Sequence, residues 1–309
     1  MEPSRLKHSF GFKTPIAFLG SCFTEHLHKH LAAYQMPVSL GPNGIIFNPL
    51  SLAFPLQLAI QKNTYSKEDI FSSQGMCVSR YHHGSVADLN AELLLERIQA
   101  DHIRFEQTLQ QTQHIVVTFG SAYVYEHIEQ KTVYANCHKL PGQHFRKYLL
   151  SVDQIVKTWS DIIIAFETQW PQIKWLFTVS PVKHLKDGIH QNNLSKSTLL
   201  LAIDQLQQLH QHIDYFPSYE LLQDDLRDYR FYAEDGAHPT PQAIHYIVEQ
   251  FKAVAFNLEA QNYMALMDKY LLMQNHNRLH HQSDSALKLD QQLAQIKQQL
   301  LDEFGLQLK

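Results

Sequence analysis

The sequence has few cysteines and no long apolar run, and these two absences exclude several classes of protein. Its 309 residues include only Cys22, Cys77 and Cys137, too few for a paired disulfide framework and without the spacing of a zinc site. The best apolar stretches, 162–166 and 175–182, are far shorter than the ~18 residues of a transmembrane helix. We therefore expect a cytoplasmic protein without a membrane span.

Neither sign of charge dominates the sequence. There are 26 basic and 30 acidic side chains, for a formal net charge of −4, so the basic surface of a nucleic-acid-binding protein is not expected. The segment 19–22 resembles a lipoprotein cleavage box, but only residues 16–19 form an apolar stretch before it, and a secretory core needs ~7 to 15 residues. Lipid anchoring at Cys22 is therefore disfavoured.

Apolar strand-like and helix-like patterns alternate along most of the chain. This alternation predicts an α/β layer structure with a mainly parallel central sheet. A hairpin is predicted over 123–133, and the capping pairs Asn48-Pro49 and Thr240-Pro241 each predict a helix start. The expected strands cover 15–19, 115–119, 173–179 and 213–216, and the expected helices cover 23–35, 88–111, 151–168, 194–212 and 241–255, with a further helix after 48.

The composition changes after residue 256, where glutamine, histidine and leucine dominate and strand patterns end. Two helices are predicted, over 257–273 and 285–304, with the polar stretch 274–283 between them. We therefore divide the chain into an α/β domain, 1–256, and a C-terminal helical extension, 257–309. The extension either packs back on the domain or offers a surface for self-association.

Three short polar segments follow predicted strands or precede the last helix of the domain. They are 20–22, 120–121 and 235–238. Ligands of open parallel sheets collect at the carboxyl ends of the strands, where such loops meet. In the third segment, Asp235 stands three residues before His238 on a loop with a glycine, so the carboxylate can hold one imidazole nitrogen and leave the other free as a base.

Five separated blocks, in order, resemble one known family. They are Phe18-Leu19-Gly20-Ser21-Cys22-Phe23, Gly44-Ile45-Ile46-Phe47-Asn48-Pro49, Gly120-Ser121-Ala122-Tyr123-Val124-Tyr125, Asn136-Cys137-His138-Lys139 and Tyr229 to Pro239. This pattern resembles the bacterial GSCFA family of the SGNH (GDSL-type) hydrolase superfamily. The resemblance implies a three-layer α/β/α sandwich and an esterase-like site acting on O-acylated carbohydrates or other short acyl esters.

The resemblance leaves two nucleophiles open. SGNH enzymes carry their serine in a Gly-Asp-Ser turn, and an ungapped alignment places Cys22 at the serine and Ser21 at the aspartate. A cysteine at a helix N-terminus facing a histidine is a good acyl acceptor. Ser21 would attack instead if the turn were one residue tighter. In either case the resemblance implies His238 as the general base and Asp235 as the residue that orients it.

The resemblance also implies a set of groups that bind the oxyanion or the substrate. Gly44 is the expected second-block donor, with Gly41 as a competitor, and Gly120 belongs to the third block. That block lacks the usual asparagine, so Ser121 or Asn136 would have to replace it. His138 either contacts the substrate or closes a structural hydrogen bond.

The missing asparagine keeps open a scaffold that binds ligands without turnover. A second alternative is an O-acyltransferase, in which a second alcohol instead of water takes up the acyl group from the acyl-enzyme. No metal or nucleotide cofactor is expected, because the pair His26 and His30 lacks a third ligand at dependable spacing and the loop 41–44 lacks the lysine of a phosphate-binding loop.

Overall fold

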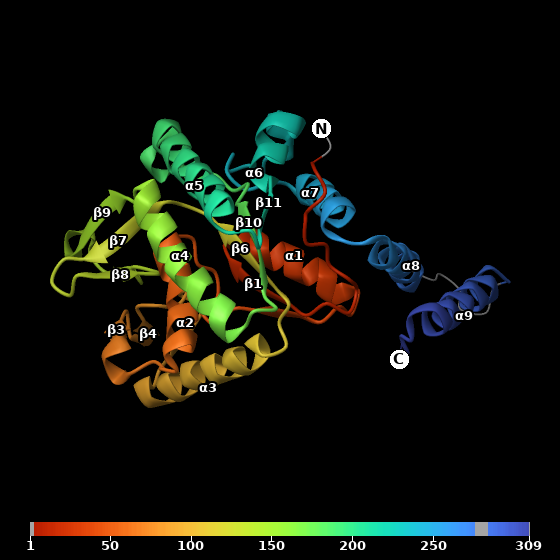
Figure 1. Cartoon of the computed structure of the whole chain (residues 1–309), viewed down its shortest axis with the longest axis horizontal. Coiled ribbons are helices and arrows are strands. Elements are labelled where there is room, and N and C mark those ends of the chain that lie inside the picture. Colours follow the sequence, from red (N-terminus) through yellow and green to blue (C-terminus); the bar gives the residue numbers. More distant parts are fainter. Residues whose placement is uncertain (1–2, 276–283, 309) are drawn as a thin grey trace.

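A parallel β-sheet forms the centre of the molecule. The computed structural model describes residues 3–275 and 284–308. Within them, five strands lie in the order β11-β10-β6-β1-β2, and every neighbouring pair is parallel; Figure 1 shows β6, β1 and β10 in the middle. The strands are β1 (Ile16–Gly20), β2 (Val38–Leu40), β6 (His114–Phe119), β10 (Lys174–Val179) and β11 (Ile213–Phe216). The predicted α/β fold with a mainly parallel sheet is therefore confirmed.

Helices cover both faces of this sheet, which gives three layers. Alternate residues of each strand point to opposite faces, so Ala17 and Val117 belong to one hydrophobic cluster, while Phe18 and Val116 belong to another. The first cluster is closed by α2 (Pro49–Gln61), α3 (Ala91–Leu109), α4 (Val152–Gln169) and α5 (Ile189–Leu209), and the second by α1 (Cys22–Ala33), α7 (Pro241–Ala255) and α8 (Leu258–Gln274).

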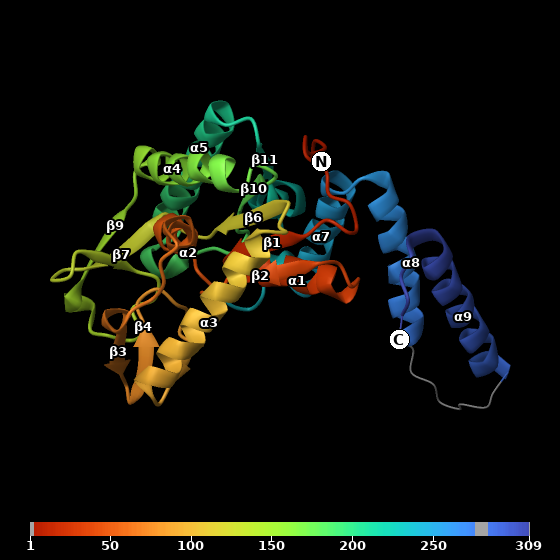
Figure 2. The same ribbon diagram turned by 60° about the horizontal axis from the view of Figure 1, so that its bottom comes forward.

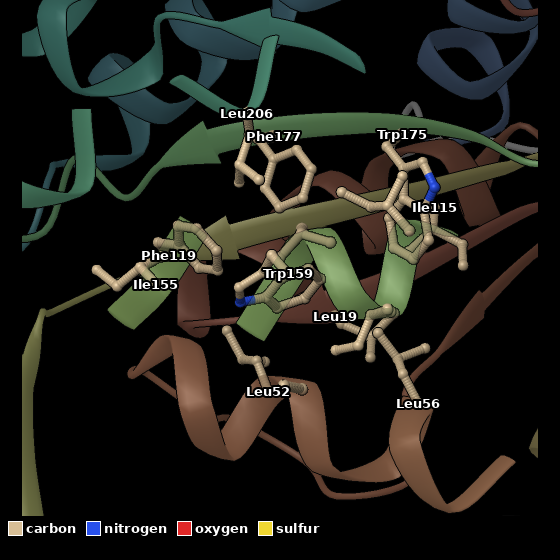
Figure 3. Close-up of a cluster of buried hydrophobic side chains, with 14 of the residues drawn as sticks. Leu19, Leu52, Leu56, Ile115, Phe119, Ile155, Trp159, Trp175, Phe177 and Leu206 are labelled. Carbon is tan, nitrogen blue, oxygen red and sulfur yellow. The ribbon is translucent and has the colours of Figure 1, made fainter. Parts of the chain in front are cut away.

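Trp159 of α4 lies at the centre of the first cluster (Figure 3). Its side chain is fully buried, and its indole N–H donates to the carbonyl oxygen of Pro49 at 3.2 Å. Its ring packs edge-on against Phe119, Trp175 and Phe177, with centroids 5.2 to 6.1 Å apart. This packing joins α2 and α4 to the sheet and holds the strand ends in place.

The predicted capping residues begin their helices as expected. The side chain of Asn48 accepts a hydrogen bond from Ser51 N at 2.8 Å, and Pro49 is the first residue of α2. Thr240 accepts from Ala243 N at 3.3 Å, with Pro241 as the first residue of α7. Both arrangements satisfy backbone N–H groups that the first helical turn leaves free. The start of helix α5 was predicted at residue 194, but the helix begins at Ile189, five residues earlier.

Two small antiparallel sheets lie beyond one end of the central sheet (Figure 1). One contains β3 (Ile70–Ser73), β4 (Met76–Ser79) and β5 (Ala87–Asp88); the other contains β7 (Tyr123–His127), β8 (Thr132–Tyr134) and β9 (Phe145–Leu149). Pairing of β7 with β8 confirms the predicted hairpin. The other four of these strands, and β2, were not predicted. Arg80 O accepts from Ala135 N at 2.8 Å and so links the two small sheets.

The C-terminal helices α8 and α9 (Asp284–Phe304) lie side by side at one end of the molecule (Figures 1 and 2). Tyr263 of α8 donates its hydroxyl to Tyr34 O after α1 and stacks on Phe12. Helix α8 therefore packs back on the domain. Most of the polar stretch predicted at 274–283 lies outside the described residues. In the described part of the chain, no helix is long and apolar enough to cross a membrane.

Candidate active site

A tight turn after β1 carries both candidate nucleophiles. Gly20 has φ of +150°, and its carbonyl oxygen accepts from Ile46 N at 2.9 Å. A Cβ at Gly20 would lie 2.5 Å from Thr118 O, so the backbone of β1 approaches β6 more closely than any other residue would permit. Ser21 is the N-cap of α1 and Cys22 is its first residue. The turn therefore presents both side chains at the carboxyl edge of the sheet.

Ser21 and Cys22 have different surroundings. Ser21 is 1% exposed, and its hydroxyl oxygen has no hydrogen-bond partner among the described residues. Cys22 is half-buried. Burial raises the pKa of the Cys22 thiol, while the backbone N–H groups of Phe23 and of Cys22 itself lower it, as the positive end of a helix does. Glu25 raises the pKa of the thiol further, and Lys196 lowers it.

Asp235 and His238 form the pair that their spacing predicts. His238 Nδ1 lies 2.5 Å from Asp235 Oδ2, and Asp235 Oδ1 accepts the backbone N–H groups of Ala237 and His238, each at 2.9 Å. The backbone N–H groups of His238 and Ala237, and then the His238 side chain, lower the pKa of Asp235 to about 2. The carboxylate is therefore ionised at neutral pH, and it leaves His238 Nε2 free, with no hydrogen-bond partner among the described residues.

The loop with His238 lies at the same edge of the sheet as Cys22. Ala237 O accepts from Lys183 N at 3.0 Å, which ties this loop to the segment after β10. The charge of His238 also lowers the pKa of His26, one helical turn after Cys22, although burial is the larger cause. Among the described residues, no hydrogen bond joins His238 to Cys22 or Ser21. The loop with His238 and the turn with Cys22 therefore lie at the same edge of the sheet, without a hydrogen bond between the imidazole and either candidate nucleophile.

For the esterase-like site that the resemblance implies, we predict that Asp235→Asn lowers kcat/KM for ester hydrolysis by about tenfold or more at neutral pH, because the amide no longer favours the imidazole tautomer with a free Nε2. The pKa of Asp235 is lower in the folded than in the unfolded protein. The ionised carboxylate therefore stabilises the folded state at pH values above its unfolded pKa, and this stabilisation is lost as the pH falls through about 2. Thermal unfolding of Asp235→Asn at several pH values checks this sign. A variant whose stability relative to wild type is the same from pH 2 to pH 7 would contradict it.

The third-block residues Gly120 and Ser121 support the structure. Their backbone N–H groups both donate to Phe47 O, at 2.8 and 3.0 Å. The Ser121 hydroxyl accepts from Tyr123 N at 3.1 Å and lies 3.2 Å from Ser195 Oγ. These two backbone N–H groups are therefore already engaged by Phe47 O, and a role of Gly120 and Ser121 in binding the oxyanion or the substrate stays a prediction.

Gly44 is better placed than Gly41 to donate an N–H group. Gly41 N donates to Phe18 O at 2.8 Å, whereas Gly44 N has no acceptor among the described residues. The backbone of Gly44 has φ of +73°, which favours glycine. Its loop is held against the nucleophile turn by the bond from Ile46 N to Gly20 O.

The fourth block contributes one structural residue and one residue that lines a pocket. His138 is buried, and its Nε2 lies 2.8 Å from Ser79 O, so it closes a structural hydrogen bond. This is the structural hydrogen bond expected as one of the two alternatives for His138, and a contact with substrate stays a prediction. Asn136 accepts from His138 N at 2.8 Å and faces a pocket of about 270 Å³. The pocket is lined also by Phe47, Ser121, Tyr123, Tyr125, Lys147 and His184.

Three residues on α5 form hydrogen bonds to loops of the candidate site and were not predicted. Asn192 accepts from His184 N at 2.9 Å, Ser195 accepts from Ala122 N at 2.8 Å, and Lys196 donates to Gly120 O and Ser180 O. The available signal was a lysine on the apolar stripe of a predicted helix, three residues before Leu199. Among the described residues, no cluster of three or more His, Cys, Asp or Glu side chains is suited to a metal ion.

The model of the GSCFA family matches residues 15–251. The chain belongs to the GSCFA family. Comparison with curated proteins gives no match. Among solved structures, it is similar to a carbohydrate esterase family 3 protein from Talaromyces cellulolyticus (8% identity, 83% of this chain and 99% of that one, TM-score 0.37). It is also similar to an acetyl xylan esterase from Butyrivibrio proteoclasticus (10% identity, 78% of this chain and 64% of that one, TM-score 0.40).

Proposed function

We propose that this GSCFA protein is an acyl-ester hydrolase that forms a covalent acyl-enzyme on Cys22. One observation carries the proposal. The Asp235–His238 pair, with Nδ1 and Oδ2 2.5 Å apart, and the helix N-terminus with Cys22 lie at the same carboxyl edge of one parallel sheet. A nucleophile, a base and a residue that orients the base are the parts that acyl transfer needs.

The reaction has two halves. Cys22 Sγ attacks the ester carbonyl carbon as His238 Nε2 accepts the thiol proton. The tetrahedral intermediate then breaks its bond to the alcohol oxygen, which takes that proton from His238. In the second half, His238 takes a proton from water, the hydroxide oxygen attacks the thioester, and the proton returns to Cys22 as the carboxylic acid leaves. Asp235 holds Nδ1–H and stabilises the imidazolium in both halves.

Backbone N–H groups at the start of α1 and at Gly44 are suited to stabilise the oxyanion. The backbone N–H groups of Cys22 and Phe23 lower the pKa of the Cys22 thiol, and Gly44 N has no acceptor among the described residues. One such donor is typically worth about 2.7 to 4 kcal/mol in the transition state. These three backbone donors replace the side-chain amide that the third block lacks.

We infer that the pocket of about 270 Å³ beside Ser121 receives the alcohol part of an O-acylated carbohydrate. Tyrosine rings offer flat apolar faces with a polar tip, which suits a ring that carries hydroxyl groups. Asn136 and Lys147 add polar groups to the lining. Phe47 and His184 belong to this lining and contact each other's rings, with centroids 5.3 Å apart.

Replacing Tyr125 by alanine is therefore expected to raise KM for an acetylated xylo-oligosaccharide by about tenfold, by loss of a stacking surface. Hydrolysis of p-nitrophenyl acetate, which has no sugar ring, should change less than about twofold. Tyr125→Phe is the matched control, because it keeps the ring. Equal losses on both substrates would show that Tyr125 supports the fold rather than the sugar.

Turnover of p-nitrophenyl acetate by the full chain tests the proposed function. Wild type is expected to release p-nitrophenol above the buffer rate and to show an acetyl adduct on the peptide with Cys22 after rapid quenching. His238→Ala should lose at least about a hundredfold in rate, the size typical of general acid–base catalysis. An inert wild-type protein would overturn the proposal and favour a scaffold that binds without turnover.

A further inference from the structure

The loop with His238 is exposed, so packing in the core does not hold it. The side chains of His238 and Asp235 are 56% and 50% exposed. Ala233 N donates to His238 O at 2.8 Å, and Tyr232 forms an antiparallel bridge with Pro239. These bonds join the two ends of the loop, so a contact that fixes Tyr232 also limits the movement of His238. A base on such a loop needs an anchor outside it to keep its position relative to the nucleophile.

Lys183, in the segment after β10, contacts this loop at two points. Its backbone N–H donates to Ala237 O at 3.0 Å, next to His238. Its side-chain Nζ lies 3.7 Å from the centroid of the Tyr232 ring and 5.6 Å from that of the Tyr229 ring. A cation within about 6 Å of a ring centroid is attracted by the negative face of the ring. Lys183 is therefore bound to the loop both by its backbone and by its ammonium group.

The charge of Lys183 is met by aromatic rings and not by a carboxylate. Within the residues that the structure describes, Lys183 forms no ion pair, and Asp235 on the same loop is paired with His238 instead. Partial burial lowers the pKa of Lys183, because the ammonium group loses hydration. The rings of Tyr229 and Tyr232, with centroids 6.2 Å apart, offer their faces to this charge. A cation–π contact is stronger in such partly desolvated surroundings.

We propose that Lys183 is a positioning residue for His238. Its ammonium group holds Tyr232 and Tyr229, and through them the loop, so that the imidazole stays at the edge of the sheet where Cys22 lies. The proposal rests on the proposed function in one respect, that His238 acts as the base. Lys183 acts through the loop and not on the reacting atoms.

The two contacts of Lys183 can be separated, because substitution of its side chain leaves the backbone N–H group bonded to Ala237 O. Lys183→Met removes the charge and keeps a side chain of similar length, whereas Lys183→Arg keeps a cation over the rings. Tyr232→Leu removes the ring face, and Tyr232→Phe keeps it. Lys157→Met changes an exposed lysine of α4 and is the matched control.

The first measurement is kcat and KM of the full chain for p-nitrophenyl acetate. Lys183→Met is expected to lower kcat by about fivefold with KM unchanged, because the base is in place for a smaller fraction of the time. Tyr232→Leu should lower kcat by a similar factor, and the double variant should lose little more, because both changes remove the same contact. Lys183→Arg, Tyr232→Phe and the control should stay within about twofold of wild type.

The second measurement does not depend on ester hydrolysis. Hydrogen–deuterium exchange of the backbone N–H groups in 229–239, followed by mass spectrometry, is expected to be about fivefold faster in Lys183→Met than in wild type and in Lys183→Arg, with the exchange of β1 and β6 unchanged. Faster exchange of this segment in a protein that turns over no ester would support the contact between Lys183 and the loop and would overturn only the proposed function.

Any of four results would overturn the role of Lys183. Exchange of 229–239 at the wild-type rate in Lys183→Met would show that the backbone bond alone holds the loop. An unchanged kcat in an active Lys183→Met enzyme whose loop exchanges faster would show that order in the loop does not limit the reaction. Equal losses of kcat in Lys183→Arg and Lys183→Met would show that a cation over the rings is not sufficient. Additive losses in the double variant, or faster exchange in β1 and β6 as well, would mean that the substitutions weaken the fold in general.

Discussion

Replacing Cys22 by alanine is expected to reduce kcat/KM for p-nitrophenyl acetate by at least about a thousandfold, as loss of a catalytic nucleophile does. Ser21→Ala is expected to cost less than about tenfold. The expected difference follows from the positions of the two side chains. Cys22 is the half-buried first residue of α1, where the backbone N–H groups of Cys22 and Phe23 lower the pKa of its thiol. Ser21 is 1% exposed, and a substrate carbonyl would have to enter the core to reach it.

Cys77→Ala is the matched control for this comparison. Cys77 is also half-buried, but it lies on β4 with its sulfur 3.8 Å from Leu89 O, so its loss should leave the rate unchanged. Steady-state kinetics on wild type and the three alanine variants, with circular dichroism to confirm folding, show which residue is the nucleophile. An inactive Ser21→Ala beside an active Cys22→Ala would assign the nucleophile to Ser21 and contradict the ungapped alignment with the Gly-Asp-Ser turn.

The central sheet could be predicted because its inner strands are buried on both faces. β6, at 114–119, is buried at every position, and so is β1, which produces nearly continuous apolar runs of the kind that parallel strands need. The strands that were missed have no such pattern. β3 has no fully buried residue, with Ser72 exposed and its other three residues partly buried, and β5 contains only Ala87 and Asp88. Their pairing depends on neighbours in space rather than on local composition.

The candidate site could be predicted only where its chemistry is local in sequence. Asp235 and His238 are three residues apart, and one glycine loop is enough to join their side chains. The environment of Lys196 depends instead on Gly120 and Ser180, which are 76 and 16 residues away from it. The sequence pattern indicates that Lys196 lies on the apolar face of a helix, but it does not indicate which carbonyl oxygens accept hydrogen bonds from its Nζ.

Replacing Gly20 by alanine is expected to lower the free energy of unfolding by about 3 kcal/mol or more, by backbone strain and overpacking together. A Cβ at this position would lie 2.5 Å from Thr118 O and 2.6 Å from Thr24 Oγ1, and the φ of +150° is one that side chains rarely adopt. A shift of β6 or of the first turn of α1 away from the new Cβ would cost free energy, because it would break the hydrogen bond from Ser21 N to Thr118 O, which is 3.3 Å long. Denaturant unfolding followed by tryptophan fluorescence measures the loss.

Gly142→Ala is the control, because a Cβ there meets no atom within 4 Å and its φ is not positive; its effect should stay within about 0.5 kcal/mol. Ester hydrolysis should also fall in Gly20→Ala, since a shift of the turn that relieves the clash changes the position of Cys22 relative to the loop with His238. A Gly20→Ala protein as stable and as active as wild type would mean that the turn has another low-energy form. The position of Cys22 would then be set by α1 alone and would not depend on the close approach of β1 to β6.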